Sequence, residues 1–402
     1  ALYRTPYWVQ DPHNLLHDAG TEYQGFQPTF ETDIKDFLFT AGTKFKLGEF
    51  DADASASYGR NSVGYTIGNT LNPSLGASSP TSFDAGAYAF SNIIGNFDVS
   101  RSFGEVSVGL GFEGRQERFD VTAGQEESYI DGGAQSFPGL QPGNALNETR
   151  TNIGGYATLD WDVSEKFLIG GAVRYENYSD FGGNTSWKLN SRYKLGKAGV
   201  LRASYGTGFR APQAFDTDLH IAFAGGGVSR VYLSPNLIPE KSKSYTASIN
   251  YDKPHENYII GFTLEGFYTR LNNAFFLQPI GQDGFGELFE KQNGQGATVE
   301  GITLELRANY KRKIQLETGF TLQTSKFDTK VEYIDGLEGL EGLKEFIRTP
   351  SQYGFATLTI SPNKKINANI NYVYTGKMKV PHFAGAPNQL EDEIITTDPY
   401  SE

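Results

Sequence analysis

Five histidines are the residues of this sequence best suited to metal or acid–base chemistry, and two of them are closely spaced. His13 and His17, in DPHNLLHDAG, have the i, i+4 spacing of metal ligands on a helix. The glutamate of an HExxH motif is missing and Pro12 lies among turn-forming residues, so a solvated loop is the simpler interpretation. Cysteine is absent, which excludes both a disulfide framework and a thiolate metal site.

A glycine-rich segment has the spacing of a dinucleotide-binding loop but not its context. Gly109, Gly111 and Gly114, in VGLGFEG, match the pattern G-x-G-x-x-G. That motif must lie between a strand and a helix to bind phosphates, whereas these glycines lie inside a predicted strand. Small residues at close-packed positions of a sheet explain them better. Because no catalytic constellation is present elsewhere, the sequence predicts neither a cofactor nor an enzymatic activity.

Charge and hydropathy exclude two further classes of protein. The 402 residues carry a formal net charge of −12, and nucleic-acid binding needs clustered lysines and arginines. We therefore expect no nucleic-acid partner. No apolar run approaches the ~18 residues of a transmembrane helix. Membrane strands remain compatible with this hydropathy, because only alternate residues of a barrel strand are apolar.

The elements that position any functional residue are strands of alternating character. In GITLELRANY, residues 301–310, apolar side chains alternate with Thr, Glu, Arg and Asn, as on the two faces of an extended chain. About 14 such segments begin at Ile34 and end near Met378, many of them near the ~10 residues of a membrane-spanning strand. The alternation predicts that Leu110, Leu304 and Ile370 face lipid and that Glu113, Glu305 and Asn369 face a wet interior.

Short and long connections alternate along the chain, with one exception at 179–184. Short turns are expected at 47–49, 102–105, 164–166, 195–199, 253–257, 310–313 and 361–364. Long polar connections are expected at 63–81, 122–149, 209–241, 272–296, 328–349 and 379–398. An up-and-down barrel places every other connection on the same rim, which Greek-key sandwiches do not do, and a solenoid or propeller needs an internal repeat that is not found. The pattern predicts an all-β fold, a transmembrane antiparallel β-barrel.

The predicted organisation has three parts. Residues 1–33 form a loop or segment before the first complete strand, and residues 34–378 form barrel strands with long extracellular loops. Residues 379–402 form an extracellular loop that leads to final strands outside this sequence. An open barrel leaves backbone groups unpaired in lipid, so we expect the roughly 14 strands to belong to a larger closed barrel.

Two short motifs lie at the two ends of one long connection, the first in GTGFRAPQAFDTDLH and the second in LSPNLIPEKSKSY. They resemble the FRAP and NPNL-PE boxes of TonB-dependent outer-membrane receptors; the matching residues are Phe209, Arg210, Ala211, Pro212, Pro235, Asn236, Leu237, Pro239, Glu240 and Ser242. Ser234 stands where the family usually has Asn. EGITLELRANY is also similar to that family's barrel, so the resemblance covers essentially the whole chain.

This resemblance implies active import of a scarce solute across the bacterial outer membrane. The family's barrel has 22 strands, is plugged by an N-terminal domain and is energised through TonB. The implied solute is an iron chelate, a siderophore; a haem or cobalamin receptor and a passive porin or adhesin-like barrel are the alternatives. The sequence lacks the plug and the TonB-contacting segment, so we expect an interior piece of a longer receptor. The expected partners are TonB through the plug, a small chelate, outer-membrane lipids and a surface protein at the long loops.

Candidate ligand-binding residues lie between the two boxes. Haem receptors of this family commonly carry an iron-ligating histidine there, which the resemblance assigns to His220 if the solute is haem; local hydrogen bonding is its alternative role. Arg210 and Arg230 are further candidates, and Arg210 has the alternative of pinning the loop or facing the plug. The acidic repeat GLEGLEGL at 336–343 indicates an outer loop that either moves freely or docks a partner.

Overall fold

Antiparallel strands dominate the part of the chain that the computed structural model describes, which is residues 3–4, 28–135, 137–213, 221–222, 230–232, 236–283, 286–311, 313–329, 344–382 and 393–401. Helical structure within these ranges is limited to four short 3-10 turns: η1 (Pro73–Ser78), η2 (Glu126–Ser128), η3 (Ile130–Gly132) and η4 (Pro142–Asn144). No helix in the described ranges is long and apolar enough to cross a membrane.

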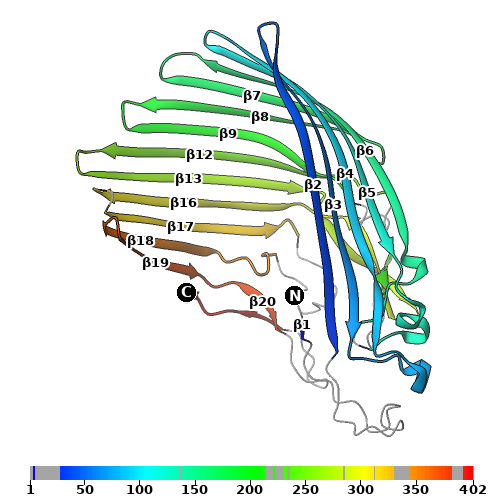
Figure 1. Cartoon of the computed structure of the whole chain (residues 1–402). Helices are drawn as coiled ribbons and strands as arrows, with labels where there is room; N and C mark the ends of the chain where they lie inside the picture. Colours follow the sequence, from blue (N-terminus) through cyan, green and yellow to red (C-terminus); the bar gives the residue numbers. More distant parts are fainter. Residues whose placement is uncertain are drawn as a thin grey trace.

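One large antiparallel sheet holds the long strands of this fold (Figure 1). Of its 16 strands, β1 (Tyr3–Arg4) and β22 (Tyr400–Ser401) have two residues each, which leaves 14 long strands. These are β2 (Thr29–Leu47), β3 (Phe50–Gly68), β4 (Ser82–Phe103), β5 (Val106–Thr122), β6 (Leu146–Asp162), β7 (Phe167–Tyr178), β8 (Gly182–Leu195), β9 (Gly199–Arg210), β12 (Glu240–Pro254), β13 (Tyr258–Asn272), β16 (Ala297–Tyr310), β17 (Ile314–Phe327), β18 (Gln352–Asn363) and β19 (Ile366–Thr375). The predicted all-β class and strand number are confirmed.

The two rims of the sheet carry different kinds of connection. Each long strand pairs with the next long strand along the chain, so successive connections lie at opposite ends of the strands. The short turns form one rim, along the top and left of Figure 1, and the long connections leave from the other. The short link between β7 and β8 lies on the long-loop rim, as the exception at 179–184 predicted. The loops after β5 and β17 start at the rim opposite Lys311 and Lys313, which confirms the predicted alternation.

Two strand boundaries differ from the sequence prediction. β2 begins at Thr29 rather than at Ile34, and β3 continues to Gly68, through residues expected to form a loop. Gly64 and Ser62 are poor strand formers, yet they pair in register with residues of β2. Pairing with a neighbouring strand overrides weak local preference, so the first hairpin is longer than its composition indicates.

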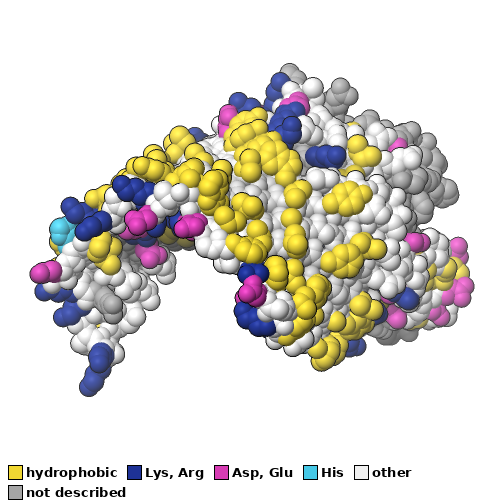
Figure 2. Space-filling model, turned by 90° about the horizontal axis from the view of Figure 1, so that it is seen from above, with side chains coloured by type: hydrophobic (Ala, Val, Ile, Leu, Met, Phe, Trp, Pro, Cys, Tyr) yellow, Lys and Arg dark blue, Asp and Glu magenta, His cyan; other side chains and the backbone are white. Residues whose placement is uncertain are grey.

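The two faces of the sheet differ in chemistry. Leu304 is 41% exposed on one face, and Leu110 and Ile370 are exposed on the same face. On the opposite face Glu305 lies 3.4 Å from Arg307, measured from carboxylate oxygen to guanidinium nitrogen. Figure 2 shows hydrophobic side chains spread over the outer surface. An apolar surface of this extent requires an apolar medium, so we name it the lipid face and the other the lumen face.

Packing is concentrated where the long loops fold over the rim. Leu140, from the loop after β5, is buried against Val121 at the end of that strand. Asn72 is fully buried: its side-chain amide donates to the carbonyl oxygens of Glu127 and Ile130 at 2.9 and 2.8 Å, and its Oδ1 accepts the Ser74 N–H at 3.0 Å. These contacts tie the β3–β4 and β5–β6 loops into one platform.

Two small sheets lie among the other long connections. β10 (Ile221–Ala222), β11 (Arg230–Tyr232), β15 (Gly286–Asn293) and β14 (Phe275–Asp283) form a four-stranded sheet, in which β11 and β15 are parallel. β20 (Lys379–His382) pairs with β21 (Glu393–Thr396). The four-stranded sheet joins the connection after β9 to the connection after β13, so these two loops fold together.

The large sheet has two long unpaired edges in the described chain. On its outer side β2 pairs with β1 only at Thr29 and Phe30, and β19 pairs with β22 only at Tyr374 and Thr375. The remaining backbone groups along these two edges face no strand. Unpaired edges are costly in lipid, which is consistent with strands that belong to a larger closed barrel. Closure into a barrel of 22 strands stays a prediction.

Candidate functional site

The two sequence boxes lie side by side because they flank neighbouring strands. β9 ends at Arg210 and β12 begins at Glu240, and the strand register pairs these two residues directly. Their side chains form an ion pair, with 3.1 Å between Arg210 Nη1 and Glu240 Oε2. The long connection that carries the candidate ligand-binding residues is therefore closed at its base by one salt bridge.

Glu240 also holds the next long connection. Its side chain is buried, the residue being 8% exposed, and its second oxygen accepts the Phe275 N–H at 2.7 Å. The Arg210 guanidinium carbon lies 5.1 Å from the centre of the Phe275 ring. Both carboxylate oxygens of Glu240 thus have partners, as a buried charge requires. We call Arg210, Glu240 and Phe275 the rim clasp.

Asn293 fastens the second box to the β14–β15 hairpin. Its Oδ1 accepts the Ile238 N–H at 2.8 Å, and its Nδ2 donates to the carbonyl oxygens of Ile238 and Asn273 at 2.7 and 3.0 Å. Leu237 and Pro239, on either side of Ile238, are buried. The box sequence therefore supplies a backbone segment that is hydrogen-bonded on one side and packed on the other.

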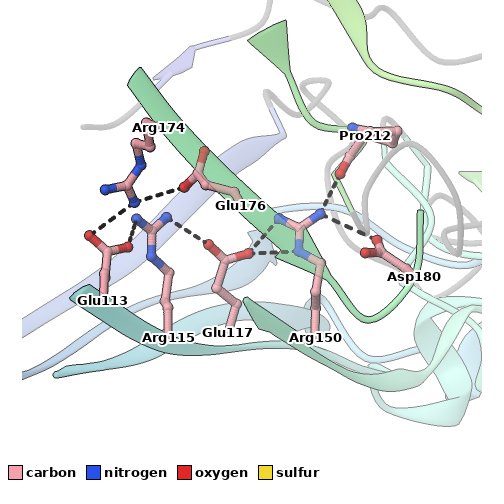
Figure 3. Close-up of polar contacts among 8 residues, drawn as sticks. All are labelled: Glu113, Arg115, Glu117, Arg150, Arg174, Glu176, Asp180 and Pro212. Carbon is pink, nitrogen blue, oxygen red and sulfur yellow. Dashed lines mark hydrogen bonds and ion pairs between the residues drawn. The ribbon is translucent and has the colours of Figure 1, made fainter. Parts of the chain in front are cut away.

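The first box is held by a charged group on the lumen face (Figure 3). The carbonyl oxygen of Pro212, a fully buried residue, accepts a hydrogen bond of 2.5 Å from Arg150 Nη1 on β6. Arg150 Nε donates to Glu117 Oε2 on β5 at 2.9 Å, and Nη2 donates to the same oxygen. The Arg150 guanidinium also lies over the Tyr178 ring, 5.2 Å from its centre.

This contact is one end of a longer series of ion pairs. Arg115 lies 2.5 Å from Glu113 and 3.3 Å from Glu117, and Arg174 lies 3.4 Å from Glu113 and 2.8 Å from Glu176. The alternate residues of β5 face lipid, so these side chains line the lumen. We call the set the inner-wall network: Glu113, Arg115, Glu117, Arg150, Arg174 and Glu176. This set has three carboxylates and three guanidinium groups, and Arg150 has a fourth carboxylate beside it, because Asp180 Oδ2 lies 3.5 Å from Arg150 Nη1 (Figure 3).

Asn152 lies within this network without a hydrogen-bond partner. The residue is 2% exposed, and among the described atoms neither its Oδ1 nor its Nδ2 is bonded. Arg115, its register partner on β5, has an unbonded Nε. A buried amide of this kind costs about 1–3 kcal/mol when left unsatisfied, and a bound water is the usual partner.

A second ion pair anchors the long connection after β17. Arg270 forms two hydrogen bonds to the Asp328 carboxylate, and the Asp328 N–H donates to the Gly296 carbonyl oxygen at 3.0 Å. The hydrogen bonds from Arg270 hold the pKa of the Asp328 carboxyl below its usual range. The carboxylate is exposed, so this pair orients the start of the loop more than it stabilises the fold.

The sequence-predicted ligand residues are only partly described. His220, His13, His17, Pro235 and the acidic repeat at 336–343 lie outside the described residues. Arg230 belongs to β11, where its backbone pairs with Ala222 and Leu288. Arg210 is directed at Glu240, which matches its alternative role of pinning the loop. Ligand binding by Arg210, Arg230 and His220 stays a prediction.

The inner-wall network was not predicted from the sequence. A signal was present, because FEGRQERF places Glu113, Arg115 and Glu117 two residues apart on one face of a strand. The partners Arg150 and Arg174 follow only from the register of β5, β6 and β7. No cluster of His, Asp and Glu that could hold a metal ion occurs within the described part of the chain.

Comparison with known families adds to this geometry. The sequence profile described as "TonB dependent receptor-like, beta-barrel" matches residues 2–401. The chain belongs to this family. Family members are transport proteins of the bacterial outer membrane and are not enzymes, so the predicted recognition, membrane location and absence of catalysis are confirmed.

Individual relatives are longer than this chain, which covers only part of each of them. The vitamin B12 transporter BtuB of Photobacterium profundum is 25% identical over 265 residues, which is 63% of this chain and 38% of that protein. The siderophore receptor PirA of Acinetobacter baumannii has a TM-score of 0.67 at 14% identity, over 93% of this chain and 55% of that chain. The ferric enterobactin receptor PfeA of Pseudomonas aeruginosa has a TM-score of 0.64 at 14% identity, over 94% of this chain and 53% of that chain. This chain thus spans about half of these receptor structures and less of the transporter.

Proposed function

We propose that this chain is part of the barrel of a receptor that imports an iron chelate of the siderophore class by TonB-dependent transport. The family match over residues 2–401 is the observation that carries the transport proposal. The iron chelate is supported by the structural relatives, since PirA is a siderophore receptor and PfeA a ferric enterobactin receptor. At 14% identity this similarity supports the fold alone, so the identity of the solute must be determined by a separate experiment.

Cobalamin is the second candidate solute. The curated relative with 25% identity is a vitamin B12 transporter, and a BtuB of Vibrio vulnificus is 25% identical over 111 residues. Haem is a third candidate and depends on His220. A passive porin or adhesin-like barrel is the alternative outside this transport class, and it would leave the paired boxes and the rim clasp without a role.

The described residues contribute a framework to this function. The rim clasp fixes the ends of two long connections at the rim where a solute enters. The inner-wall network lines part of the lumen with charged groups that are paired with one another. We assign selection of a charged chelate to the loops, which surround the entrance, while the wall beneath them supplies hydrogen-bond donors and acceptors to a hydrated path.

The partners of the whole receptor follow from the same proposal. TonB contact is assigned to the N-terminal plug that the family uses, and the strands described in this chain are not assigned to it. A surface protein partner at the long loops is a further proposal, motivated by the acidic repeat at 336–343. Lipid contact is assigned to the exposed apolar face that carries Leu110, Leu304 and Ile370.

Uptake by cells tests the solute and the energy requirement together. The full-length receptor is expressed in a strain that lacks its own receptors, and uptake of a ferric catecholate, a ferric hydroxamate, cyanocobalamin and haemin is measured. We expect uptake of a ferric chelate that stops when the proton gradient is collapsed. Cyanocobalamin uptake alone would replace the iron chelate by the second candidate, and uptake that persists without the gradient would contradict active transport.

A further inference from the structure

Four short turns in the second half of the sheet are strongly basic. The turns β8–β9, β12–β13, β16–β17 and β18–β19 contain, in or directly beside them, seven described lysines: Lys194, Lys197, Lys253, Lys311, Lys313, Lys364 and Lys365. We call these seven residues the basic arc. Two acidic residues, Glu256 and Asp252, lie in or directly beside the same four turns, and Asp252 is ion-paired with Arg307. Basic side chains are visible along the left edge in Figure 2, where Figure 1 places these turns.

The charges of the basic arc are not compensated within the described chain. All seven lysines are exposed, and none of them forms an ion pair with a described carboxylate. The first hairpin of the sheet is different, because Lys46 lies 2.6 Å from Asp51 and Lys44 lies 3.6 Å from Asp53. On the same rim, the described lysines of the first hairpin therefore have ion-pair partners, and the seven lysines of the basic arc have none among the described carboxylates.

Aromatic side chains fix the height of the arc relative to the membrane. Tyr193, Tyr258 and Tyr310 are exposed on the lipid face, each at the turn end of its strand. Lys311 Nζ lies 5.5 Å from the centre of the Tyr310 ring. Exposed tyrosines of a barrel lie at the level of lipid headgroups, so the lysines beside them are within reach of phosphate groups.

We propose that the basic arc binds anionic phospholipid headgroups, of the phosphatidylglycerol type, in the leaflet next to the short turns. An anionic headgroup carries a net negative charge that can pair with these lysines, whereas the phosphate of a zwitterionic headgroup is already balanced by the headgroup's own amine. Short turns of such barrels face the periplasm, which places the arc at the inner leaflet of the outer membrane. Because the arc covers only the turns from β8 to β19, the anionic lipids gather on one side of the barrel.

Lipid titration of the purified receptor tests this proposal. The full-length receptor in mild detergent is titrated with phosphatidylglycerol or phosphatidylethanolamine of identical acyl chains, and bound lipid is measured by native mass spectrometry. The variant Lys311→Gln/Lys313→Gln/Lys364→Gln/Lys365→Gln removes four charges of the arc. At about fivefold per lysine near a charged surface, we expect phosphatidylglycerol affinity to fall by two to three orders of magnitude at low salt.

A matched control variant, Lys44→Gln/Lys46→Gln, changes lysines that are already ion-paired, and we expect its lipid affinity to equal that of the wild type. Salt should weaken the wild-type preference, because the screening length falls from about 30 Å at 0.01 M to about 3 Å at 1 M. The corresponding fourfold Lys→Arg variant should retain binding, which separates loss of charge from loss of folding.

Three outcomes would overturn the proposal. Equal affinity for the two lipids, or unchanged phosphatidylglycerol binding in the fourfold Gln variant, would remove the headgroup as the occupant. An acidic protein that co-purifies with the wild type and not with the Gln variant, while lipid affinity stays the same, would reassign the arc to a protein partner. Heat-modifiable migration on gels shows in each case whether the barrel remains folded.

Discussion

Removal of the Glu240 side chain is the most direct test of the rim clasp. Glu240→Ala leaves the Phe275 N–H without its 2.7 Å acceptor, and an unsatisfied buried donor costs about 1–3 kcal/mol. Glu240→Gln keeps an acceptor oxygen in place and loses only the ion pair to Arg210, whose side chain is 52% exposed. A pair screened to that extent is worth about 0–1 kcal/mol. The alanine variant should therefore be the more damaging of the two.

Hydrogen exchange at the Phe275 amide measures this difference locally. In the folded receptor in lipid, we expect exchange to accelerate about 5- to 160-fold in Glu240→Ala, since 1.36 kcal/mol corresponds to tenfold. Glu240→Gln and Arg210→Ala should each change it by about fivefold or less. Equal acceleration in the Gln and Ala variants, or a larger effect of Arg210→Ala than of Glu240→Ala, would refute the assignment of the hydrogen bond to the Phe275 N–H as the main contribution of Glu240 to the stability of the rim clasp.

Three further predictions follow from the two faces, the loops and the second ion pair. Leu304→Arg, on the lipid face, should lower the free energy of unfolding in bilayers by about 2–4 kcal/mol, while Asn371→Arg on the lumen face should change it little; equal effects would contradict the face assignment. If the solute is haem, His220→Ala should weaken haem uptake at unchanged outer-membrane levels, because a residue of a long connection contributes little to folding; unchanged uptake would remove His220 from the site. The depressed pKa of Asp328 means that its loop anchor is present above the ordinary aspartate pKa of about 3.9 and is lost as the pH falls; Asp328→Asn should lower the protection factor of the residue-328 amide at neutral pH, as acid should do in the wild type once the rates are corrected for intrinsic exchange, and an unchanged protection factor would contradict the anchor.

The strands and their rims were determined by local sequence pattern. Alternation of apolar and polar residues has period two, and a run such as 301–310 shows both faces without reference to any other segment. Loop length is equally local, so the alternation of short and long connections was visible too. The overall fold and its membrane setting could therefore be predicted, and the two boxes added the family.

The functional framework was decided by register and by long-range packing. Glu113, Arg115 and Glu117 mark a charged strand face, but only the register between β5 and β6 identifies Arg150 as a partner of Glu117. A one-residue slip would move Arg150 to the lipid face, and no short sequence window encodes that choice.

The same limit applies to the boxes and to the strand ends. The FRAP and NPNL-PE boxes named Arg210 and Glu240 as family residues, and tertiary structure gave them a common role by placing β9 beside β12. The extent of β3 was likewise decided by pairing with β2, which carried the strand through Ser62 and Gly64. The sequence by itself determined which face of each strand is apolar, because that property is local. Which charges meet was decided only by the tertiary structure, because contacts between strands depend on how distant segments align.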